Sequence, residues 1–445
     1  MSIYPESLIA FASQLPSPLY AVGGCVRDTL LGKASHDIDL CSAMTPEIIR
    51  KYAKAAGFPC PLVNERLGTV LLCIDGRKYE HTTFRTESYP SGGNHMPEKI
   101  AFTESLEKDA LRRDFSVNAI YQNVLTGELC DPCNGIDDLK NRILRTTTED
   151  PSLILKDDGL RILRLVRFAI STGFSVDPKT LAAAKEYASL LDDIAWERKR
   201  EEFDRILLLD DPLRGLEMLT DVGALFLLIP ELRSCDGLLQ REDYHRHDVL
   251  RHLFHTCACM PPVIEYRLMG LLHDIGKPAA FERDGNYYHH ADMGSVISET
   301  VLRRLVYPNA IIRRIKTAVR WHMFDLDGNA RESTVRKRFV SIGRQGTEDL
   351  ILLREADILG SGIQTDYKAA KFRRIYSAML SDGCPWSADE LALSGSELME
   401  ALKLSPSREI ALIKEKLLLH CVCHPLDNRP EKLLQIARDI CVKKA

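Results

Sequence analysis

The hydrophobic and polar positions of this chain follow two patterns, and the change comes near residue 145. Before that point, short apolar runs such as LYAVGG, TVLLCID and SVNAIYQN stand between helical stretches and predict strands. After it, apolar residues recur at helical spacing to the end, interrupted by Pro and Gly. The pattern predicts a multi-domain chain in which a mixed α/β head precedes an all-α body.

The composition is that of an ordinary globular protein. The 445 residues are 45% hydrophobic and 27% charged, and this length suits two to four domains. No apolar run approaches the ~20 residues that cross a membrane, and the N-terminus lacks a signal-peptide pattern. Thirteen scattered cysteines suit a reducing compartment. We therefore expect a cytoplasmic protein without a membrane partner.

Charge by itself says little about a nucleic-acid partner, because the net charge is −4. Basic clusters nevertheless recur, such as Arg313-Arg314 and Arg336-Lys337-Arg338. Such clusters can make a local positive track on an acidic protein, although most single clusters are solvated helix faces.

The segment LYAVGGCVRDTLLGKASHDIDLCS carries the first candidate chemistry. Its pattern predicts a strand, a glycine turn, a helix, a loop and a second strand. At Gly23-Gly24 backbone N–H groups can approach a phosphate without a Cβ in the way, and Arg27 follows within one helical turn. Asp37 and Asp39 alternate with Ile38, so a strand would place both carboxylates on one face. Two oxygen ligands beside a phosphate-binding turn suit Mg²⁺ with a nucleoside triphosphate.

This combination resembles the head of the nucleotidyltransferase superfamily, which contains poly(A) polymerases and the CCA-adding enzymes. The resemblance implies that Asp37 and Asp39 are catalytic and hold Mg²⁺, and that Gly24 and Arg27 bind the nucleotide. Glu80, on the predicted strand RKYEHTTFR, either completes the carboxylate cluster or pairs with a nearby arginine.

The segment LEKDALRRDFSVNAIYQ groups Arg112, Arg113, Asp114 and Asn118, whose side chains can bind phosphate and sugar hydroxyls. It resembles the RRDFT-x-NA motif of class II CCA-adding enzymes and bacterial poly(A) polymerases, with Ser116 in place of Thr. The resemblance implies that Arg113 binds the triphosphate.

In the segment LILKDDGLRILRLVRF, Asp158 and Arg161 stand at i and i+3 and are predicted to share a helix face, which Arg164 and Arg167 continue. Cytosine and adenine present an amino donor beside a ring-nitrogen acceptor, whereas guanine and uracil present a carbonyl in place of the amino group. A carboxylate and an arginine could therefore accept C and A and reject G and U without a template. A wrong base would leave buried polar groups unpaired, at a cost of about 1–3 kcal/mol per group.

The same segment resembles the E-D-x-x-R base-reading motif of class II tRNA nucleotidyltransferases, followed by their R-x-x-R-x-x-R-F run. The resemblance implies that Asp158 and Arg161 read the base and that Arg164 and Arg167 assist at the triphosphate. Asp157 stands where the family has Glu, one methylene longer.

Two further comparisons with the family pattern concern the neck. Gly159 stands where Ala is common, and it should weaken a helix by about 1 kcal/mol relative to Ala. The next helical motif, WERKREEFDRIL, resembles one that braces the neck, so Glu197, Arg198 and Glu201 are expected to be structural.

Histidine and aspartate residues in the middle of the chain form a second constellation. This mix suits a divalent metal, and an adjacent His-Asp at a helix end sends both side chains into one site. The order resembles the HD-domain metal phosphohydrolases, which implies a second divalent transition metal and phosphoester hydrolysis. The alternative is a set of histidines that only pack and hydrogen-bond. The residues are His252, His273, Asp274, His290, His322 and Asp357.

Together the motifs resemble a class II CCA-adding enzyme, a tRNA nucleotidyltransferase, with an embedded HD domain. The resemblance implies template-independent addition of C, C and A to the 3′ end of tRNA, from CTP and ATP, by a two-metal mechanism. The expected parts are a nucleotidyltransferase head at 1–145, a helical neck with the base-reading motif at 146–230, an HD domain and body at 231–375, and a helical, tRNA-binding tail at 376–445.

Several alternatives stay open. A poly(A) polymerase shares the head but tends to carry a basic C-terminal extension, which this chain lacks. An A-adding-only enzyme would look almost the same, whereas the polar, glycine-bearing loop expected at 86–107 argues against a CC-only enzyme. From another class, the chain could be an HD phosphohydrolase with an inactive head. The pattern indicates no oligomeric state.

Overall fold

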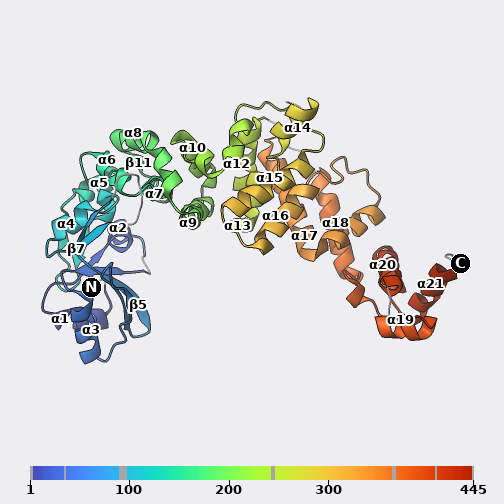
Figure 1. The fold of residues 1–445 in the computed structure, drawn as a ribbon, viewed down its shortest axis with the longest axis horizontal. Helices are drawn as coiled ribbons and strands as arrows, with labels where there is room; N and C mark the ends of the chain where they lie inside the picture. Colours follow the sequence, from blue (N-terminus) through green and yellow to red (C-terminus); the bar gives the residue numbers. More distant parts are fainter. Residues whose placement is uncertain are drawn as a thin grey trace. The chain divides into compact units, whose positions relative to one another are not determined.

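A computed structural model of the protein describes residues 4–34, 37–89, 98–241, 246–362, 367–405 and 408–442. They form two compact units, Met1–Pro230 and Glu231–Ala445 (Figure 1). Among the described helices, none is both long and apolar enough to cross a membrane.

A seven-stranded mixed sheet is the centre of the first unit, in the order β3-β4-β5-β2-β1-β8-β9. Strand β2 runs antiparallel to β1 and parallel to β5, where Leu40 pairs with His81. Asp39 and Glu80 therefore occupy neighbouring positions on adjacent strands. The strands are β1 (Tyr20–Val22), β2 (Asp39–Ser42), β3 (Leu62–Asn64), β4 (Thr69–Ile74), β5 (Arg77–Thr83), β8 (Tyr121–Asn123) and β9 (Leu129–Cys130).

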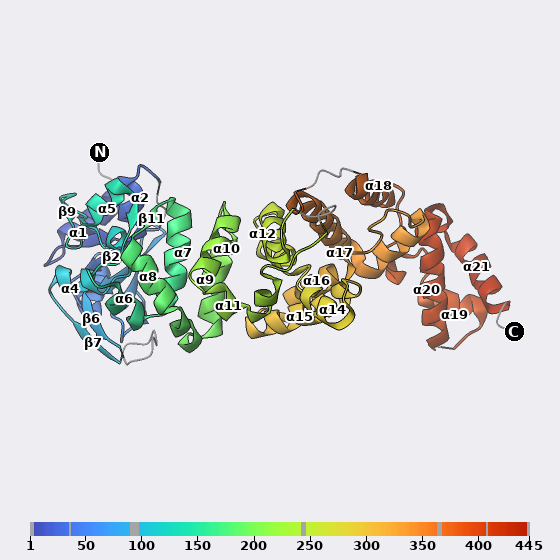
Figure 2. The same cartoon turned by 90° about the horizontal axis from the view of Figure 1, so that it is seen from above.

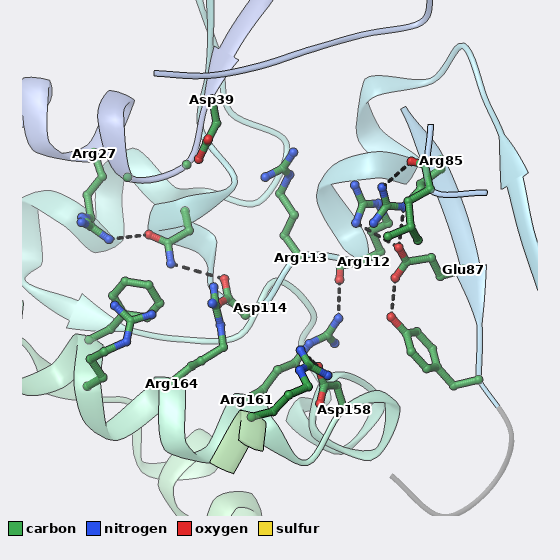
Figure 3. A pocket seen from close by; sticks show the side chains of 18 residues that line it. Arg27, Asp39, Arg85, Glu87, Arg112, Arg113, Asp114, Asp158, Arg161 and Arg164 are labelled. Carbon is green, nitrogen blue, oxygen red and sulfur yellow. Dashed lines mark hydrogen bonds and ion pairs between the residues drawn. The ribbon is translucent and has the colours of Figure 1, made fainter. Parts of the chain in front are cut away.

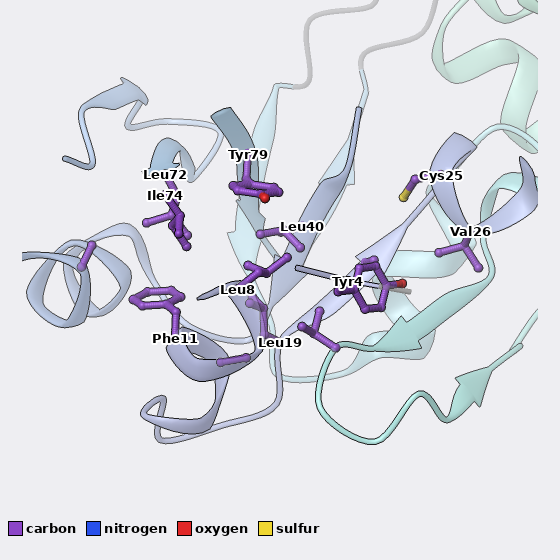
Figure 4. Packing of buried hydrophobic residues seen from close by; sticks show 14 of the residues in the cluster. Tyr4, Leu8, Phe11, Leu19, Cys25, Val26, Leu40, Leu72, Ile74 and Tyr79 are labelled. Atoms are coloured by element: carbon purple, nitrogen blue, oxygen red, sulfur yellow. The ribbon is translucent and has the colours of Figure 1, made fainter. Parts of the chain in front are cut away.

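One face of this sheet packs on apolar helix faces. Phe11 and Ala53, from two different helices, enter one core with Leu40 and Leu72 of the strands, and all four are almost fully buried (Figure 4). The period-2 and period-3.6 apolar patterns thus meet in one layer. The helices of the head are α1 (Glu6–Ser13), α2 (Gly24–Leu30), α3 (Pro46–Ala55), α4 (Leu106–Leu111) and α5 (Gly135–Asn141).

The predicted order of strand, glycine turn, helix and strand at the N-terminal motif is confirmed by β1, α2 and β2. Ile38 packs against the core, as expected, but β2 begins only at Asp39, so Asp37 lies just before the strand.

The prediction of one loop over 86–107 is wrong at both ends. Residues Arg85–Ser88 form β6 and pair with β7 (Lys99–Phe102) as an antiparallel hairpin, and α4 follows at Leu106. Residues 90–97 lie outside the described residues. The side chains of β6 therefore alternate between the two faces of the hairpin, and this alternation orients residues of the site described below.

Helices dominate the first unit after residue 145, as predicted. Asp-Pro pairs begin three of them: the Asp150, Asp177 and Asp211 carboxylates accept from backbone N–H groups of the first turn, and the proline that follows each occupies a position without a hydrogen-bonding duty. A short parallel pair, β10 (Ile143–Leu144) and β11 (Ser175–Val176), accompanies them. The helices are α6 (Pro151–Asp157), α7 (Leu160–Thr172), α8 (Pro178–Glu186), α9 (Trp196–Leu207), α10 (Pro212–Asp221) and α11 (Leu225–Leu228).

The described part of the second unit is helical (Figure 2). Phe339, Phe372 and Trp386 belong to one of its buried cores. Ser394 and Glu397 form a capping box at the start of α19. The helices are α12 (Val249–Cys259), α13 (Ile264–Leu272), α14 (Lys277–Asp284), α15 (His290–Arg304), α16 (Asn309–Trp321), α17 (Glu332–Gly360), α18 (Tyr367–Ser381), α19 (Gly395–Leu402), α20 (Arg408–Cys423) and α21 (Pro430–Val442). The predicted fold class, a mixed α/β head followed by a helical body, is confirmed.

Candidate nucleotide site and metal centre

A cavity of about 740 Å³ lies in the first unit between the sheet and the helices that follow it (Figure 3). The glycine turn, β2, β6, the RRDFSVN segment, α7 and α9 supply its lining. Asp37 and Glu80 are not lining residues. The predicted site residues that line it are Gly24, Arg27, Asp39, Arg113, Asp158, Arg161, Arg164 and Arg167.

Positive charge dominates this cavity. Eight lining side chains are arginines, whereas four are carboxylates: Asp39, Glu87, Asp114 and Asp158. Guanidinium forks match the oxygens of phosphate, and an excess of them in a concave site concentrates a polyanion. The cavity therefore suits a nucleoside triphosphate.

The glycine turn brings the backbone close to the carboxylate of Asp39. Gly23 has φ +83°, a left-handed conformation that favours glycine, and a Cβ there would lie 3.9 Å from Asp39 Oδ2. One helical turn on, the Arg27 guanidinium donates to Asn118 Oδ1 at 2.7 Å and to Asp28 Oδ1 at 2.9 Å. Arg27 is thus held in position at the cavity wall.

Three charged groups act on Asp39 and its neighbour Glu80. The pKa of Asp39 lies above its ordinary value, because burial and the charge of Asp37 raise it by more than Arg113 lowers it. The pKa of Glu80 also lies above its ordinary value, because burial and the charge of Asp39 raise it by more than Arg85 lowers it. Glu80 therefore interacts with both the carboxylate and the arginine that the sequence left as alternatives.

The carboxylates fit Mg²⁺ in a particular way. Among the described residues, the sets of three ligand atoms that lie within 4.8 Å of one another are both in the second unit, so Asp37, Asp39 and Glu80 do not form such a set. Mg²⁺ is commonly held by one or two carboxylates together with substrate phosphates and water. Asp37 and Asp39 suit that arrangement without Glu80.

The buried carboxylate of Asp109 holds two arginines of the cavity. It accepts from Arg112 Nη2 at 2.7 Å and from Arg113 Nη2 at 3.1 Å, and Tyr121 donates to it at 2.8 Å. Although burial opposes ionisation, Arg113 and Arg112 lower the pKa of Asp109 to about 2. The sequence pattern does not mark Asp109, because its role arises only from partners that the fold brings to it.

Asp158 and Arg161 do not stand on one continuous helix, so the prediction of a shared helix face is wrong. Helix α6 ends at Asp157, and Asp158 has φ −150° and ψ 106°. Its Oδ1 accepts from the N–H of Leu160, where α7 begins, at 3.0 Å. Asp158 is thus a residue of a helix break, while Arg161 lies in the first turn of α7; both still line the cavity.

Arg161 is rigidly placed. Its exposed fraction is 7%, and its Nη1 and Nη2 donate to the carbonyls of Ile154 and Arg112 at 2.7 and 2.8 Å. Each nitrogen carries a second N–H, so the guanidinium keeps donors besides these two. The fixed side chain is what a group that discriminates between bases requires.

Arg164 and Arg167 have carboxylate partners of their own. Arg164 binds Asp114 with two nitrogens at 2.8 and 2.6 Å, and Arg167 Nε donates to Glu202 at 2.7 Å. Both guanidinium groups also lie on the ring of Phe168, at 5.3 and 4.1 Å from its centroid. The pairs hold them at the wall with part of their charge offset.

The second unit brings all six predicted His and Asp residues together. His252 Nε2 lies 3.1 Å from His273 Nε2 and 3.0 Å from Asp357 Oδ1. The remaining pair, His290 and His322, have their Nε2 atoms 3.1 Å apart. Two sets result, His252–His273–Asp357 and Asp274–His290–His322.

The Asp274 carboxylate lies between the two sets. Its Oδ1 is 3.0 Å from His290 Nε2 and 3.3 Å from His322 Nε2, and its Oδ2 is 3.3 Å from His273 Nε2. Lys277 Nζ lies 2.5 Å from the same Oδ2. A carboxylate placed in this way can bridge two metal ions, so the donor set fits a dinuclear centre of nitrogen and oxygen ligands.

Backbone carbonyls orient three of the imidazoles. The Nδ1 atoms of His273, His290 and His322 lie 2.8, 2.6 and 2.6 Å from the carbonyls of Gly270, Tyr287 and Val319. A carbonyl partner makes Nδ1 the donor and leaves Nε2 as the ligand atom. Burial lowers the pKa of His273, but Asp274 and Asp357 raise it to about 10.

Comparisons with known proteins match three parts of the chain. The model of the poly A polymerase head domain matches residues 19–145, that of the probable RNA and SrmB-binding site of polymerase A matches 173–235, and that of the HD domain matches 254–359. An A-adding tRNA nucleotidyltransferase of Deinococcus radiodurans is 31% identical over 410 residues, which are 87% of this chain and 88% of that relative. The chain belongs to the tRNA nucleotidyltransferase family.

Other members of this family match a shorter segment. A CCA-adding enzyme of Streptococcus gordonii is 39% identical over 222 residues, 50% of this chain and 54% of that enzyme.

The crystal structure of the Bacillus stearothermophilus CCA-adding enzyme in complex with CTP has a TM-score of 0.72 at 22% identity and covers 99% of this chain and 98% of its own. The likeness to this structure shows the fold. The predicted membership, with an HD domain inside the helical body, is confirmed.

The two departures from the family's base-reading motif have structural counterparts. Asp157, where the family has Glu, reaches to 3.9 Å from Arg161 Nη1 and stays 37% exposed at its side chain, so this contact is weak. Gly159 caps α7, and a Cβ there would lie 2.7 Å from the carbonyl oxygen of Leu190. The close approach of that backbone requires glycine in this chain and explains the absence of the family's alanine.

Four polar residues that line the tRNA nucleotidyltransferase cavity were not predicted as site residues. Arg85, Glu87 and Tyr89 alternate along and beyond β6; the buried Glu87 carboxylate accepts from Arg85 at 2.6 Å, from Arg112 at 3.2 Å and from the Tyr89 hydroxyl. The signal was the period-2 spacing of R-x-E-x-Y, which the loop prediction hid. Arg198, expected to be structural, lines the cavity 3.9 Å from Asp158.

Proposed function

We propose that this tRNA nucleotidyltransferase adds C, C and A to the 3′ end of tRNA, using CTP and ATP and no template. The observation that carries the proposal is that Asp39, the arginines for a triphosphate, and the Asp158–Arg161 pair line one cavity. A nucleotide whose phosphates lie beside Asp39 can therefore present its base to groups that accept C and A. The tRNA would be held by shape and backbone, as expected for structured RNA.

Each residue has a role in the proposed reaction. Asp37 and Asp39 would hold Mg²⁺, which when bound lowers the pKa of the primer 3′-hydroxyl and stabilises the departing pyrophosphate. Arg27 and Arg113 orient the triphosphate beside the backbone of Gly24. Asp158 accepts from the exocyclic amino group of the base, and Arg161 donates to the ring nitrogen.

Two relatives favour different products. The relative that covers 87% of this chain is an A-adding enzyme by its name, whereas the CCA-adding enzymes are more similar over half the chain. An A-adding enzyme, or a poly(A) polymerase, is therefore the second candidate. Incubation with tRNA ending at the discriminator base, at C or at CC, each with a single labelled nucleotide, separates them. Incorporation of ATP alone, and only after CC, would replace CCA addition by A addition.

We propose further that the HD centre is a metal-dependent phosphohydrolase and holds two divalent transition-metal ions. The support is the bridging position of Asp274 between two three-residue ligand sets. Within the chain, we assign base reading to 146–230 and tRNA binding to the tail at 376–445, and we expect the protein to act in the cytoplasm.

A further inference from the structure

One arginine of the nucleotide cavity differs from the others in its hydrogen bonding. Each of the other lining arginines donates to a protein acceptor at 2.9 Å or less. Within the described part of the chain, Arg198 makes no such side-chain bond, and its ion pair with Asp158 spans 3.9 Å from Nη2 to Oδ2. Its Nη1 is buried and also lacks an acceptor. A guanidinium carries five N–H donors, so Arg198 keeps donors for a ligand.

The fold places Arg198 at the wall of the cavity. The residue lies in the first turn of α9, where its N–H donates to the carbonyl of Ala195 at 3.1 Å. Its side chain is 37% exposed, whereas that of Asp158 is 14% exposed and already accepts from the N–H of Leu160. The guanidinium therefore lies beside a fixed carboxylate, with part of its surface open to the cavity.

Arg198 belongs to the end of the cavity that is proposed to hold the base. Asp158 and Arg161 lie on the opposite side of the cavity from Asp39 (Figure 3). The phosphates are proposed to lie beside Asp39, so an arginine that contacts Asp158 is placed to meet the base instead of the phosphates.

The spacing of Asp158 and Arg198 matches one edge of adenine. An asparagine or glutamine amide binds adenine with an acceptor for the N6 amino group and a donor for N7, side by side. Asp158 Oδ2 and Arg198 Nη2 present the same acceptor and donor, 3.9 Å apart. Cytosine has an amino group as well, but the neighbouring ring position is C5–H, which accepts no hydrogen bond. A donor beside Asp158 therefore distinguishes adenine from cytosine.

The opposite side of the amino group is already served. Arg161 is proposed to donate to the ring nitrogen, and its guanidinium is fixed by the carbonyls of Ile154 and Arg112. Among the described residues, the Asp158 carboxylate forms an ion pair with Arg198 and none with Arg161. Arg198 is thus the cation next to the group that takes the amino hydrogens.

We propose that Arg198 is a specificity-determining residue that donates to N7 of adenine, so that adenine makes one contact more than cytosine. The inference rests on the proposed function, because the orientation of the base is taken from Asp158 and Arg161. A hydrogen bond from a charged donor changes affinity roughly 10- to 100-fold. The contact helps a cavity that accepts both bases to favour ATP at the step that adds A.

The test compares ATP with 7-deaza-ATP, in which C–H replaces N7 while the amino group and the ring nitrogen remain. Single-turnover addition to tRNA ending in CC and calorimetric binding are measured on the full-length protein with Mg²⁺. We expect a preference for ATP of roughly 10- to 100-fold in both. Arg198→Ala should lower the use of ATP to that of the analogue, and CTP addition to tRNA ending at the discriminator base should stay unchanged.

Two further variants serve as controls. Arg200→Ala removes an arginine of the same helix whose ion pair with Asp204 also spans 3.9 Å but which does not line the cavity, so the preference should persist. Arg198→Met keeps the apolar length of the side chain and no donor, so it should behave as Arg198→Ala. It replaces the alanine variant if urea unfolding shows that the latter does not fold.

The outcomes separate this contact from the proposed function. Equal use of ATP and 7-deaza-ATP by the wild-type protein, or a preference that survives in Arg198→Ala, overturns the N7 contact and leaves nucleotide addition standing. An equal loss for ATP, the analogue and CTP would make Arg198 a support for Asp158 and overturn base reading by Arg198. If no nucleotide is added to any tRNA, the proposed function fails, and the calorimetric preference in the wild type and its loss in Arg198→Ala decide the contact alone.

Discussion

The cavity of the first unit and the metal centre of the second unit hold their functional groups by different means. In the cavity, arginines are fixed by carboxylates, as Arg164 is by Asp114 and Arg113 by Asp109, and the Arg164 side chain stays 33% exposed. In the candidate metal centre the four histidines and Asp274 are almost fully buried, Asp357 is 19% exposed at its side chain, and backbone carbonyls orient three of the imidazoles.

The difference matches what each site is proposed to bind. A large, charged and exchangeable nucleotide needs open space and permanent cations, and those cations need counter-charges that hold them apart without cancelling them. A metal ion needs neutral imidazoles at fixed positions, and a buried carbonyl partner keeps both the tautomer and the ring in place. The two sites should therefore respond differently to substitution.

The largest effect is expected from Asp39→Ala. Loss of a carboxylate that holds Mg²⁺ should reduce nucleotide addition by about 10³-fold or more, because metal stabilisation of the transition state amounts to several kcal/mol. tRNA binding and the metal content of the second unit should remain. Single-turnover assays measure nucleotide addition, and filter binding measures tRNA binding. The control is Asp137→Ala, because the Asp137 side chain is 75% exposed. Addition at the normal rate by the Asp39 variant would remove the metal assignment.

The reverse experiment is His273→Ala or Asp274→Ala. Either should abolish bound transition metal and phosphoester hydrolysis, since His273 belongs to one ligand set and Asp274 bridges both. Nucleotide addition should stay largely intact. Elemental analysis and the addition assay test the pair. If the wild-type protein bound no transition metal and hydrolysed no phosphoester, the six residues would serve packing and hydrogen bonding only.

A smaller effect, on selectivity, is expected from Arg161. Its replacement by Ala removes the donor to the ring nitrogen, so discrimination against GTP and UTP should fall roughly 10- to 100-fold. Arg161→Lys keeps the charge but loses the fork, and is the matched control for charge alone. Because Arg161 also binds two carbonyls, urea unfolding checks that each variant is folded. An equal loss of rate for all four nucleotides, with no misincorporation, would contradict base reading.

The smallest effect concerns acid stability and Asp109. Its pKa in the folded protein, about 2, lies below the ordinary value of 3.8, so the ionised group stabilises the fold above about pH 4. That contribution, about 2 kcal/mol, should be lost as the pH falls from 4 to 2. Asp109→Asn should be less stable near neutrality and show a flatter decline over this range. Parallel urea titrations at each pH give the comparison; identical slopes for variant and wild type would disprove the linkage.

Much of both sites could be predicted because the groups involved lie close in the sequence or in a recurring order. One strand–helix–strand unit contains Gly24, Arg27 and Asp39, and the apolar spacing that predicts it can be read within one short segment. The six proposed metal ligands are residue types with few other reasons to recur in that order. The helix break at Asp158 could not be predicted from spacing, because the carbonyl of Leu190, thirty-one positions beyond Gly159, is what approaches it.

The sequence by itself determined which chemistry is present: carboxylates beside a glycine turn, an Asp–Arg pair, and a His/Asp set, within strands and helices whose periods are legible along the chain. Only the tertiary structure decided which of these groups meet. It joined Glu87 of a hairpin to Arg112, whose carbonyl holds Arg161, and it placed Asp274 between two pairs of histidines. The physical reason is that periodicity records which face of an element is buried, whereas hydrogen bonds and ion pairs between distant residues depend on how whole elements pack.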